Sequence, residues 1–266
     1  AGYTQIPLIE AAKRLGCRTI TASIKGDYPG FDIADESAYV NIADPAAVVE
    51  KAREFQVDAV ATCGLDLGMA AIGAVCEELD LPGPTAEAAR KASNKLDMKE
   101  ALVKAGVQTA RFICIHNREE LAAAMNLLPF PVILKAVDQM GSRGIYRCDT
   151  PEEVYENYGK TMEATGKDYC LLEEFIEGEI FGVEAMIQDG RVVYMLPNNI
   201  EAFQSTTPTP VGHSVPFKEL DELGEQIEEQ TKKAISSLGL DDCPVNCDFI
   251  KKDGKVYVIE LTGRSG

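Results

Sequence analysis

A lysine and a glycine-bearing loop stand together near the middle of the chain, in the stretch LKAVDQMGSRGI at residues 134–145. A glycine loop between two strands can direct its backbone N–H groups at phosphate oxygens, while lysine and arginine side chains supply positive charge. The stretch matches neither G-x-x-x-x-G-K-[ST] nor G-x-G-x-x-G, so alone it indicates an anion site only weakly, and an ordinary charged hairpin is the alternative. The residues that could contact an anion are Lys135, Gly141, Ser142, Arg143 and Gly144.

Two carboxylates near the C-terminus could bind a metal ion. Asp248 and Glu260 flank a predicted hairpin in DFIKKDGKVYVIELTGR at 248–264, and they form a magnesium site only if they share a face of the sheet. A three-residue loop at 252–254, with Gly254 in the left-handed conformation, would place them on one face. A two-residue turn would place them on opposite faces, as in a surface hairpin with stray charges. Because Glu260 follows the apolar run VYVI, we expect it near the core, where a carboxylate needs a cation.

A third polar stretch, LLEEFIEGE at 171–179, is a predicted strand that ends in two carboxylates and an aromatic residue. A strand that leaves its sheet offers backbone N–H and C=O groups to a base such as adenine. Taken alone, Glu173 and Glu174 have the pattern of solvated surface residues.

The elements that must position these residues change character along the chain. Residues 1–90 alternate helix and strand, which predicts a parallel sheet, and LPGPT at 81–85 precedes a domain boundary. The later residues predict an α+β fold with antiparallel hairpins, and TTPTPVG at 206–212 is the expected flexible loop. Helices are predicted at 6–16, 45–55, 67–80, 94–105, 117–127, 151–165 and 219–238. Strands are predicted at 19–24, 39–42, 57–63, 110–115, 131–137, 169–174, 181–188, 191–196, 245–251 and 255–261.

Composition limits the classes of partner. The 266 residues carry 43 acidic and 26 basic side chains, for a net charge of −17, which argues against nucleic acid or an anionic membrane as the partner. No signal peptide or transmembrane stretch is recognisable, so we expect a cytoplasmic protein. The eight cysteines lie mostly in apolar runs, as buried reduced thiols do, and their spacing does not predict zinc.

Together and in this order, the polar stretches resemble the ATP-grasp superfamily, whose members include biotin carboxylase, carbamoyl phosphate synthetase, glycinamide ribonucleotide synthetase and amino-acid ligases. The similar blocks are NKLDMKEALVKAGV at 94–107, PVILKAVDQMGSRGI at 131–145, LLEEFIEGE at 171–179 and DFIKKDGKVYVIELTGRSG at 248–266. The resemblance implies an α/β and α+β chain. A Rossmann-like, parallel-sheet pre-ATP-grasp domain at 1–90 would precede a two-subdomain ATP-grasp fold, with a small subdomain at 91–168 and an incomplete large subdomain at 169–266.

The resemblance also implies ATP and Mg²⁺, or Mn²⁺ in its place, as cofactors. Glu173 would meet the exocyclic amine of adenine, Glu174 and Ile176 would offer backbone groups, and Arg264 would hold an acyl phosphate. The implied nucleotide-binding residues are Lys95, Lys135, Gly141, Ser142, Arg143, Gly144, Glu173, Glu174, Phe175, Ile176 and Glu179. The implied metal ligands are Asp248, Glu260 and Thr262, and the implied catalytic residues are Arg264 and His213.

Three features depart from the family pattern. Thr262 stands where asparagine is usual, which weakens the expectation of a second metal ion. Ile180 stands where a ribose-binding glutamate is common, so Glu179 or Glu184 would have to replace it. The first strand and a C-terminal substrate-recognition region are expected to lie outside the sequence.

The implied activity is an ADP-forming carboxylate–amine ligase that works through an acyl phosphate on amino-acid or peptide-like substrates. Its partners would be a small-molecule carboxylate and amine, with a homodimer as the candidate assembly. A bicarbonate-using carboxylating or carbamate-forming enzyme and an ATP-binding protein with degenerate catalysis remain alternatives. A Rossmann-type dehydrogenase is the least favoured, because the glycine fingerprint and its acidic ribose ligand are incomplete.

Overall fold

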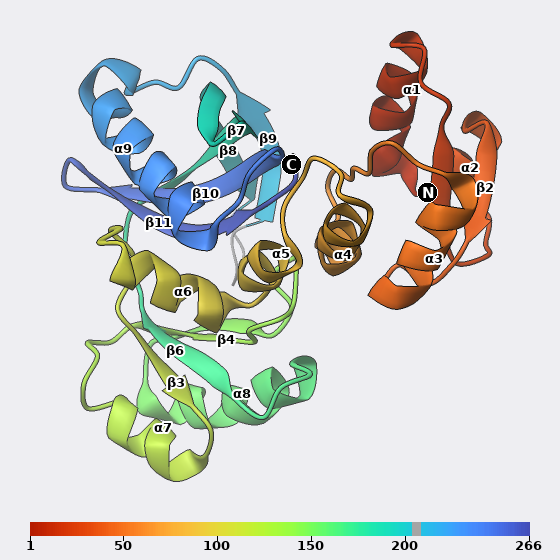
Figure 1. Ribbon diagram of the computed structural model, residues 1–266. Coiled ribbons are helices and arrows are strands. Elements are labelled where there is room, and N and C mark those ends of the chain that lie inside the picture. The colour runs from red at the N-terminus through yellow and green to blue at the C-terminus, as the bar shows by residue number, and fades with distance from the viewer. Residues whose placement is uncertain (204–208) are drawn as a thin grey trace.

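The computed structural model describes residues 1–203 and 209–266, which contain three separate sheets (Figure 1). They are a two-stranded, a four-stranded and a five-stranded sheet, and each is associated with its own hydrophobic cluster. No helix of the described residues is long and apolar enough to cross a membrane.

The N-terminal unit is built on a parallel pair of strands, β1 (Ile20–Ser23) and β2 (Glu36–Tyr39). Helices α3 (Pro45–Phe55) and α4 (Met69–Leu79) supply its apolar cluster, with Val48, Ala52 and Val75 among the buried residues. Asp44 caps α3 by accepting a bond from the N–H of Ala47, which explains why that helix begins where the sequence predicts. The short elements are η1 (Tyr3–Gln5), α1 (Ile6–Arg14), α2 (Pro29–Ile33) and η2 (Asp66–Gly68).

Two strand predictions in this unit are wrong. The strand expected at 39–42 ends at Tyr39 and begins at Glu36. Residues 57–63 form no strand, and within the described chain the β-pairing of this run is limited to an isolated parallel bridge between Cys63 and Ser265. An apolar, β-branched run becomes a strand only when a neighbouring strand pairs with its backbone.

The four-stranded antiparallel sheet has the order β3-β6-β4-β5. Helices α7 (Arg118–Ala124) and α8 (Pro151–Ala164) pack against it around a cluster that includes Leu121, Leu134 and Val154. The strands are β3 (Phe112–Ile115), β4 (Val132–Lys135), β5 (Ile145–Cys148) and β6 (Cys170–Glu174). Strand β5 is the second of the two strands expected to flank the glycine loop, whereas helix α5 (Ala86–Ser93) lies outside the predicted helices.

The five-stranded antiparallel sheet has the order β11-β10-β7-β8-β9. Helix α9 (Leu220–Leu238) covers one face, and α5 and α6 (Lys95–Lys104) add apolar residues to the same cluster. The strands are β7 (Glu179–Gln188), β8 (Arg191–Phe203), β9 (Thr209–Ser214), β10 (Pro244–Lys252) and β11 (Lys255–Thr262). Of the loop expected at 206–212, residues 206–208 lie outside the described part of the chain, and β9 begins at Thr209.

The domain limits 1–90, 91–168 and 169–266 stay predictions, and two elements group differently from them. Strand β6 pairs within the four-stranded sheet, although it begins at Cys170. Helix α6 packs its residues Met98 and Leu102 into the cluster of the five-stranded sheet. In Figure 1 this helix lies between the four-stranded and the five-stranded sheets, so residues at its N-terminus can contact both sheets.

Candidate active site

The two predicted metal-binding carboxylates face each other across the β10–β11 hairpin. Asp248 pairs directly with Glu260 in the register, so both side chains leave the same face. The predicted three-residue loop is wrong, because Lys252 pairs with Lys255 and leaves the two-residue turn Asp253-Gly254, with φ of 51° and 71°. A bulge supplies the extra residue instead. Phe249 pairs with Val258 and Asp248 with Glu260, so Ile259 is the additional residue on β11.

The proximity of the two carboxylates changes their proton affinity. Burial, followed by the charge of Glu260, raises the pKa of Asp248 to about 7. Burial acts to raise the pKa of Glu260 as well, but the charges of Lys95, Lys135 and Arg264, with the hydrogen bond from Lys95, together outweigh it and lower that pKa. Lys95 therefore balances the charge of Glu260, whereas the charge of Asp248 has no such partner among the described residues. A bound cation would stabilise the ionised form of Asp248.

Lys95, the first residue of α6, joins the carboxylates to the other sheet. Its Nζ lies 2.9 Å from Oε1 of Glu260 and donates to the carbonyl oxygen of Gln139 at 2.8 Å. Its backbone N–H donates to the carbonyl of Val137 at 2.8 Å, and the side chain of Asn94 caps the helix. The helix N-terminus and its lysine are thus fixed beside the segment that follows β4, where a phosphate would find both partial and full positive charge.

The predicted glycine loop connects β4 to β5 and turns through three residues of positive φ: Gly141 at 61°, Ser142 at 60° and Gly144 at 69°. Gly144 is required for a second reason, since an added Cβ would lie 2.7 Å from the Cβ of Ala164 and 2.8 Å from that of Ala136. Arg143 is exposed at the tip of the loop. The loop closes back on the end of β4, since the N–H of Ala136 donates to the carbonyl of Gly144 at 2.9 Å, so Lys135 lies at its base, as a phosphate-binding loop requires.

Glu173 is buried in β6 between two lysines. Its Oε2 lies 2.8 Å from Nζ of Lys135 and 3.3 Å from Nζ of Lys99, whereas its Oε1 is buried and has no hydrogen-bond partner among the described residues. Burial acts to raise the pKa of Glu173, but the charges of Lys135 and Lys99 outweigh it and lower that pKa. The structure thus places the predicted adenine carboxylate next to the predicted phosphate lysine, with one oxygen free to accept a bond.

In the hinge after β6, two of the backbone N–H groups are already paired. The N–H of Glu174 already donates to the carbonyl of Arg111 at 2.9 Å, and that of Phe175 donates to the carbonyl of Pro131 at 3.3 Å. Ile176 is buried, and within residues 1–203 and 209–266 its N–H makes no backbone hydrogen bond. The side chain of Glu174 pairs with Nε of Arg111 at 2.7 Å. The N–H of Ile176 is therefore available to a base, and the contribution of the Glu174 and Ile176 backbone groups stays a prediction.

Glu179 is not placed to bind a nucleotide with the other residues. It is exposed at the start of β7 and lies 2.9 Å from Nζ of Lys251, its register partner. Strand alternation puts Lys251 on the face of the buried Phe249, opposite to the face of Asp248. We therefore remove Glu179 from the candidate site. Glu184 does lie on the face of Asp248, two residues after Gly182.

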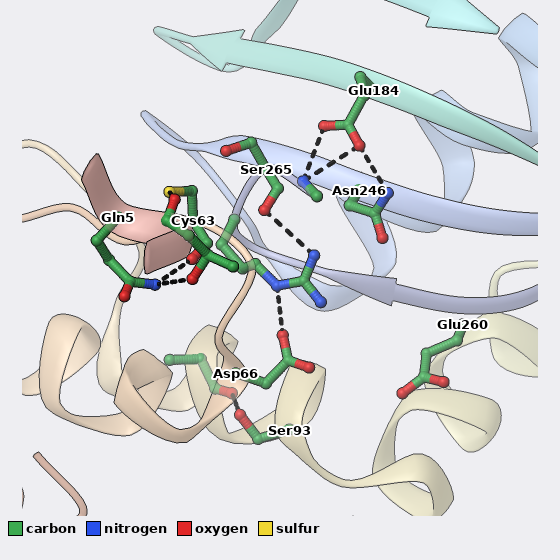
Figure 2. Close-up of polar contacts among 12 residues, drawn as sticks. Gln5, Cys63, Asp66, Ser93, Glu184, Asn246, Glu260 and Ser265 are labelled. Carbon is green, nitrogen blue, oxygen red and sulfur yellow. Dashed lines mark hydrogen bonds and ion pairs between the residues drawn. The ribbon is translucent and has the colours of Figure 1, made fainter. Parts of the chain in front are cut away.

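Arg264 reaches back to the N-terminal unit. Its Nε donates to Oδ1 of Asp66 at 2.6 Å, and its Nη1 donates to the carbonyl of Ser265 at 3.2 Å. Figure 2 labels these two partners, Asp66 and Ser265. The backbone is joined at the same place, since the N–H of Gly64 donates to the carbonyl of Ser265 at 2.9 Å. This double attachment leaves one edge of the guanidinium group for an anion.

A polar row continues across the face that carries Asp248. Nδ2 of Asn246 donates to Glu184 at 2.7 Å (Figure 2), and Glu184 also accepts from the N–H of Gly266. His213, predicted as catalytic, lies on β9 with its Nδ1 2.8 Å from Oδ1 of Asn198. The structure therefore places His213 at the far edge of the sheet from β11 and in contact with an amide rather than a carboxylate.

The donor set fits a magnesium ion that shares its coordination with phosphate oxygens and water. Mg²⁺ is commonly held by one or two carboxylates, and Asp248 and Glu260 supply that number. The hydroxyl of Thr262 is buried and has no hydrogen-bond partner among the described residues, so it is available to a ligand or a water molecule. No group of three or more His, Cys, Asp or Glu side chains that could hold a metal occurs in the described chain.

Sequence reasoning missed two residues of this site. Lys99 lies one helical turn after Lys95, and that spacing alone puts both lysines on one face of α6. Asp66 is the first residue of η2, just before α4, and nothing in its local pattern indicates a partner nearly two hundred residues away. A cavity of about 210 Å³ in the N-terminal unit is lined mainly by apolar side chains and contains none of the predicted site residues.

Comparison with known proteins identifies the family. The model of the ATP-grasp domain matches residues 128–266, just over half of the chain, so the chain belongs to the ATP-grasp family. This confirms the resemblance and the expected fold class. A crystal structure of phosphoribosylglycinamide synthetase from Anaerococcus prevotii is 41% identical, with a TM-score of 0.82 over 100% of this chain and 67% of that one.

Two curated relatives are more distant. A formate-dependent phosphoribosylglycinamide formyltransferase of Synechococcus sp. is 29% identical over 70% of this chain and 49% of its own length. An alanine–anticapsin ligase of Bacillus subtilis is 25% identical over 82% of this chain and 50% of its own length. The chain thus spans about half the length of these relatives. A Hydrogenobacter thermophilus biotin carboxylase domain solved with MgADP, 24% identical with a TM-score of 0.82 over 100% of this chain and 62% of its own, shares the fold.

Proposed function

We propose that this chain carries the nucleotide-binding and phosphoryl-transfer part of an ATP-dependent, ADP-forming carboxylate–amine ligase. One observation carries the proposal: two lysines and a glycine loop meet a pair of opposed carboxylates where α6 touches both sheets. Lys95 contacts Glu260 at 2.9 Å, and Lys135 precedes the loop that holds Gly141 and Gly144. The family membership of the chain supports the same assignment.

In this proposal the chain's own residues bind and orient ATP. Lys95, Lys135 and the loop at 141–144 neutralise the phosphates, and Glu173 accepts a bond from the base. Asp248 and Glu260 would hold Mg²⁺, which supplies charge neutralisation at the β- and γ-phosphate oxygens. Such a site accelerates the reaction mainly by positioning and by electrostatic stabilisation of the transferred phosphoryl group.

The reaction proceeds in two displacements. An oxygen of the substrate carboxylate attacks the γ-phosphorus, the bond from that phosphorus to the β–γ bridging oxygen breaks, and ADP leaves. The amine then attacks the acyl carbon of the acyl phosphate, phosphate leaves, and the nitrogen loses a proton. Arg264, held by Asp66 at 2.6 Å, is the residue we assign to the acyl phosphate or the tetrahedral oxyanion. The substrates are a small carboxylate and a small amine.

Trapping the acyl phosphate tests this function. Full-length protein is incubated with MgATP and a panel of carboxylates, with hydroxylamine in place of the amine, and both ADP and hydroxamate are measured. The panel should start from amino acids and from the acids suggested by the relatives' names. We expect hydroxamate and ADP in equal amounts for the true acid. ADP release without hydroxamate for every acid would contradict the proposal. ADP release that depends on bicarbonate would support the carboxylating alternative. Tight ATP binding without turnover would support an ATP-binding protein with degenerate catalysis.

A further inference from the structure

Lys99 is a fully buried lysine for which the reaction has no direct use. Its side chain is 1% exposed, and its Nζ donates to Oγ1 of Thr109 at 2.7 Å. Thr109 in turn donates to the carbonyl of Val258 at 2.7 Å, so the ammonium group is fixed against β11 as well as against Glu173. Burying an ammonium group is costly unless it is paired, which indicates a specific role for this one.

The partner that Lys99 shares is Glu173. Oε2 of Glu173 lies 2.8 Å from Lys135 and 3.3 Å from Lys99, while Oε1 is buried and has no hydrogen-bond partner within residues 1–203 and 209–266. Burial lowers the pKa of Lys99 to about 8, with the charge of Glu173 opposing the shift, so Lys99 is still charged at neutral pH. The carboxylate thus has two cations on one oxygen and a vacant acceptor on the other.

Nucleotide binding would separate the two cations. Our proposed function assigns Lys135 to a phosphate, and the following step rests on that assignment. When Lys135 turns to the phosphate, Lys99 is the remaining counter-charge, because Thr109 and β11 hold it in place. Glu173 then stays ionised, and an ionised carboxylate can accept hydrogen bonds but cannot donate them. Without Lys99, the buried acid would take up a proton and could donate one.

We propose that Lys99 is a positioning residue that sets the base selectivity of the site, by holding Glu173 as an acceptor for a purine with an amino group at position 6. A purine with an oxo group at that position would place this acceptor against the carboxylate of Glu173, and neither group would have a hydrogen to donate. A pocket that must pair a buried acceptor rejects the analogue that lacks the matching donor. Lys99 therefore acts through Glu173 and does not contact the nucleotide.

The test is calorimetric titration of MgATP and MgITP, which differ at position 6 of the base. We expect the wild-type chain to prefer ATP by roughly ten- to a hundredfold. In Lys99→Met that ratio should fall below about threefold, mainly because ATP binding weakens. A second variant, Thr109→Val, releases Lys99 without removing its charge and should lower the ratio to an intermediate value. Lys104→Met, at the exposed end of the same helix, is the matched control and should keep the wild-type ratio.

The ratio of affinities separates this role from a purely structural one, since general damage to the site would weaken both nucleotides alike. If folded Lys99→Met, checked by circular dichroism, keeps the wild-type ratio, the inference is wrong while the proposed function stands. If the wild type binds both nucleotides equally, Glu173 does not read the base and the inference is also wrong. If the wild type binds neither, the proposed function itself fails and the inference fails with it.

Discussion

Lys135 is the residue whose role in ATP binding can be isolated most simply. Its ammonium group lies at the end of β4, next to the loop that contains Gly141 and Gly144. A charge-assisted bond to phosphate contributes roughly 1.5 to 3 kcal/mol, so Lys135→Ala should weaken ATP binding about ten- to a hundredfold in calorimetry. Lys160→Ala, on the exposed side of α8, controls for the loss of one positive charge. Unchanged affinity in a folded Lys135→Ala chain would remove this lysine from the site.

Lys99 also makes a prediction about pH and stability. Its pKa is lowered, chiefly by burial, from 10.5 to about 8 in the folded chain. Between these values the unfolded chain binds more protons at this residue than the folded chain, so its contribution to stability rises with pH. The unfolding free energy of Lys99→Met minus that of the wild type should therefore fall by up to roughly 3 kcal/mol from pH 8 to 10.5. Urea unfolding at several pH values measures it, and a constant difference would show that Lys99 titrates normally.

At the scale of elements, alanine substitution should have different effects on stability at two glycines of similar φ in the loop between β4 and β5. Both Gly141 and Gly144 have positive φ, but an added Cβ meets nothing within 4 Å at Gly141 and would overlap Ala136 and Ala164 at Gly144. Gly141→Ala should therefore cost about 1 kcal/mol of stability and Gly144→Ala about 2 to 4 kcal/mol. Thermal unfolding of the two variants provides the comparison. Equal costs would mean that close packing at Gly144 does not define the loop.

Elements with local signals could be predicted from the sequence, and those that depend on distant partners could not. Asp44 and Pro45 fix the start of α3, and Asn94 fixes the start of α6, because a cap acts within one turn. The run at 57–63 has the composition of a strand, yet pairing decides its state. The bulge at Ile259 has no signature in the hairpin sequence, and it alone reconciles the two-residue turn with two carboxylates on one face.

The same division applies to the site. The positions of Lys95 and Lys135 follow from the block resemblance, but the distances that join Glu173 to two lysines depend on how α6 packs between the sheets. Glu179, expected from the resemblance as a replacement for the ribose ligand, shows the limit from the other direction, because only the strand register reveals that it pairs with Lys251 on the face opposite Asp248.

On the scale of the whole molecule, Asp66 and Arg264 couple the N-terminal unit to the end of β11. The pair is mostly buried, with side-chain exposures of 24% and 13%. A double-mutant cycle with Asp66→Asn and Arg264→Gln, followed by urea unfolding, should give a coupling energy of about 1 to 3 kcal/mol. The exposed pair Glu228 and Lys232 on α9 is the control, and its cycle should give a value close to zero. Additive effects of the Asp66 and Arg264 variants would contradict the coupling.

The binding of ATP with Mg²⁺ at the paired carboxylates is tested most directly by the effect of Mg²⁺ on ATP affinity. Calorimetry of the wild type and of Glu260→Gln, each with and without Mg²⁺, isolates the metal contribution, and Glu229→Gln on the exposed side of α9 controls for lost charge. Wild type and Glu229→Gln should bind ATP at least tenfold more tightly with Mg²⁺, because Asp248 and Glu260 would hold the ion and the ion would offset the charge of the phosphates. Glu260→Gln should lose most of that gain while it remains folded. A Glu260→Gln chain that keeps the full effect of Mg²⁺ would show that the metal binds elsewhere.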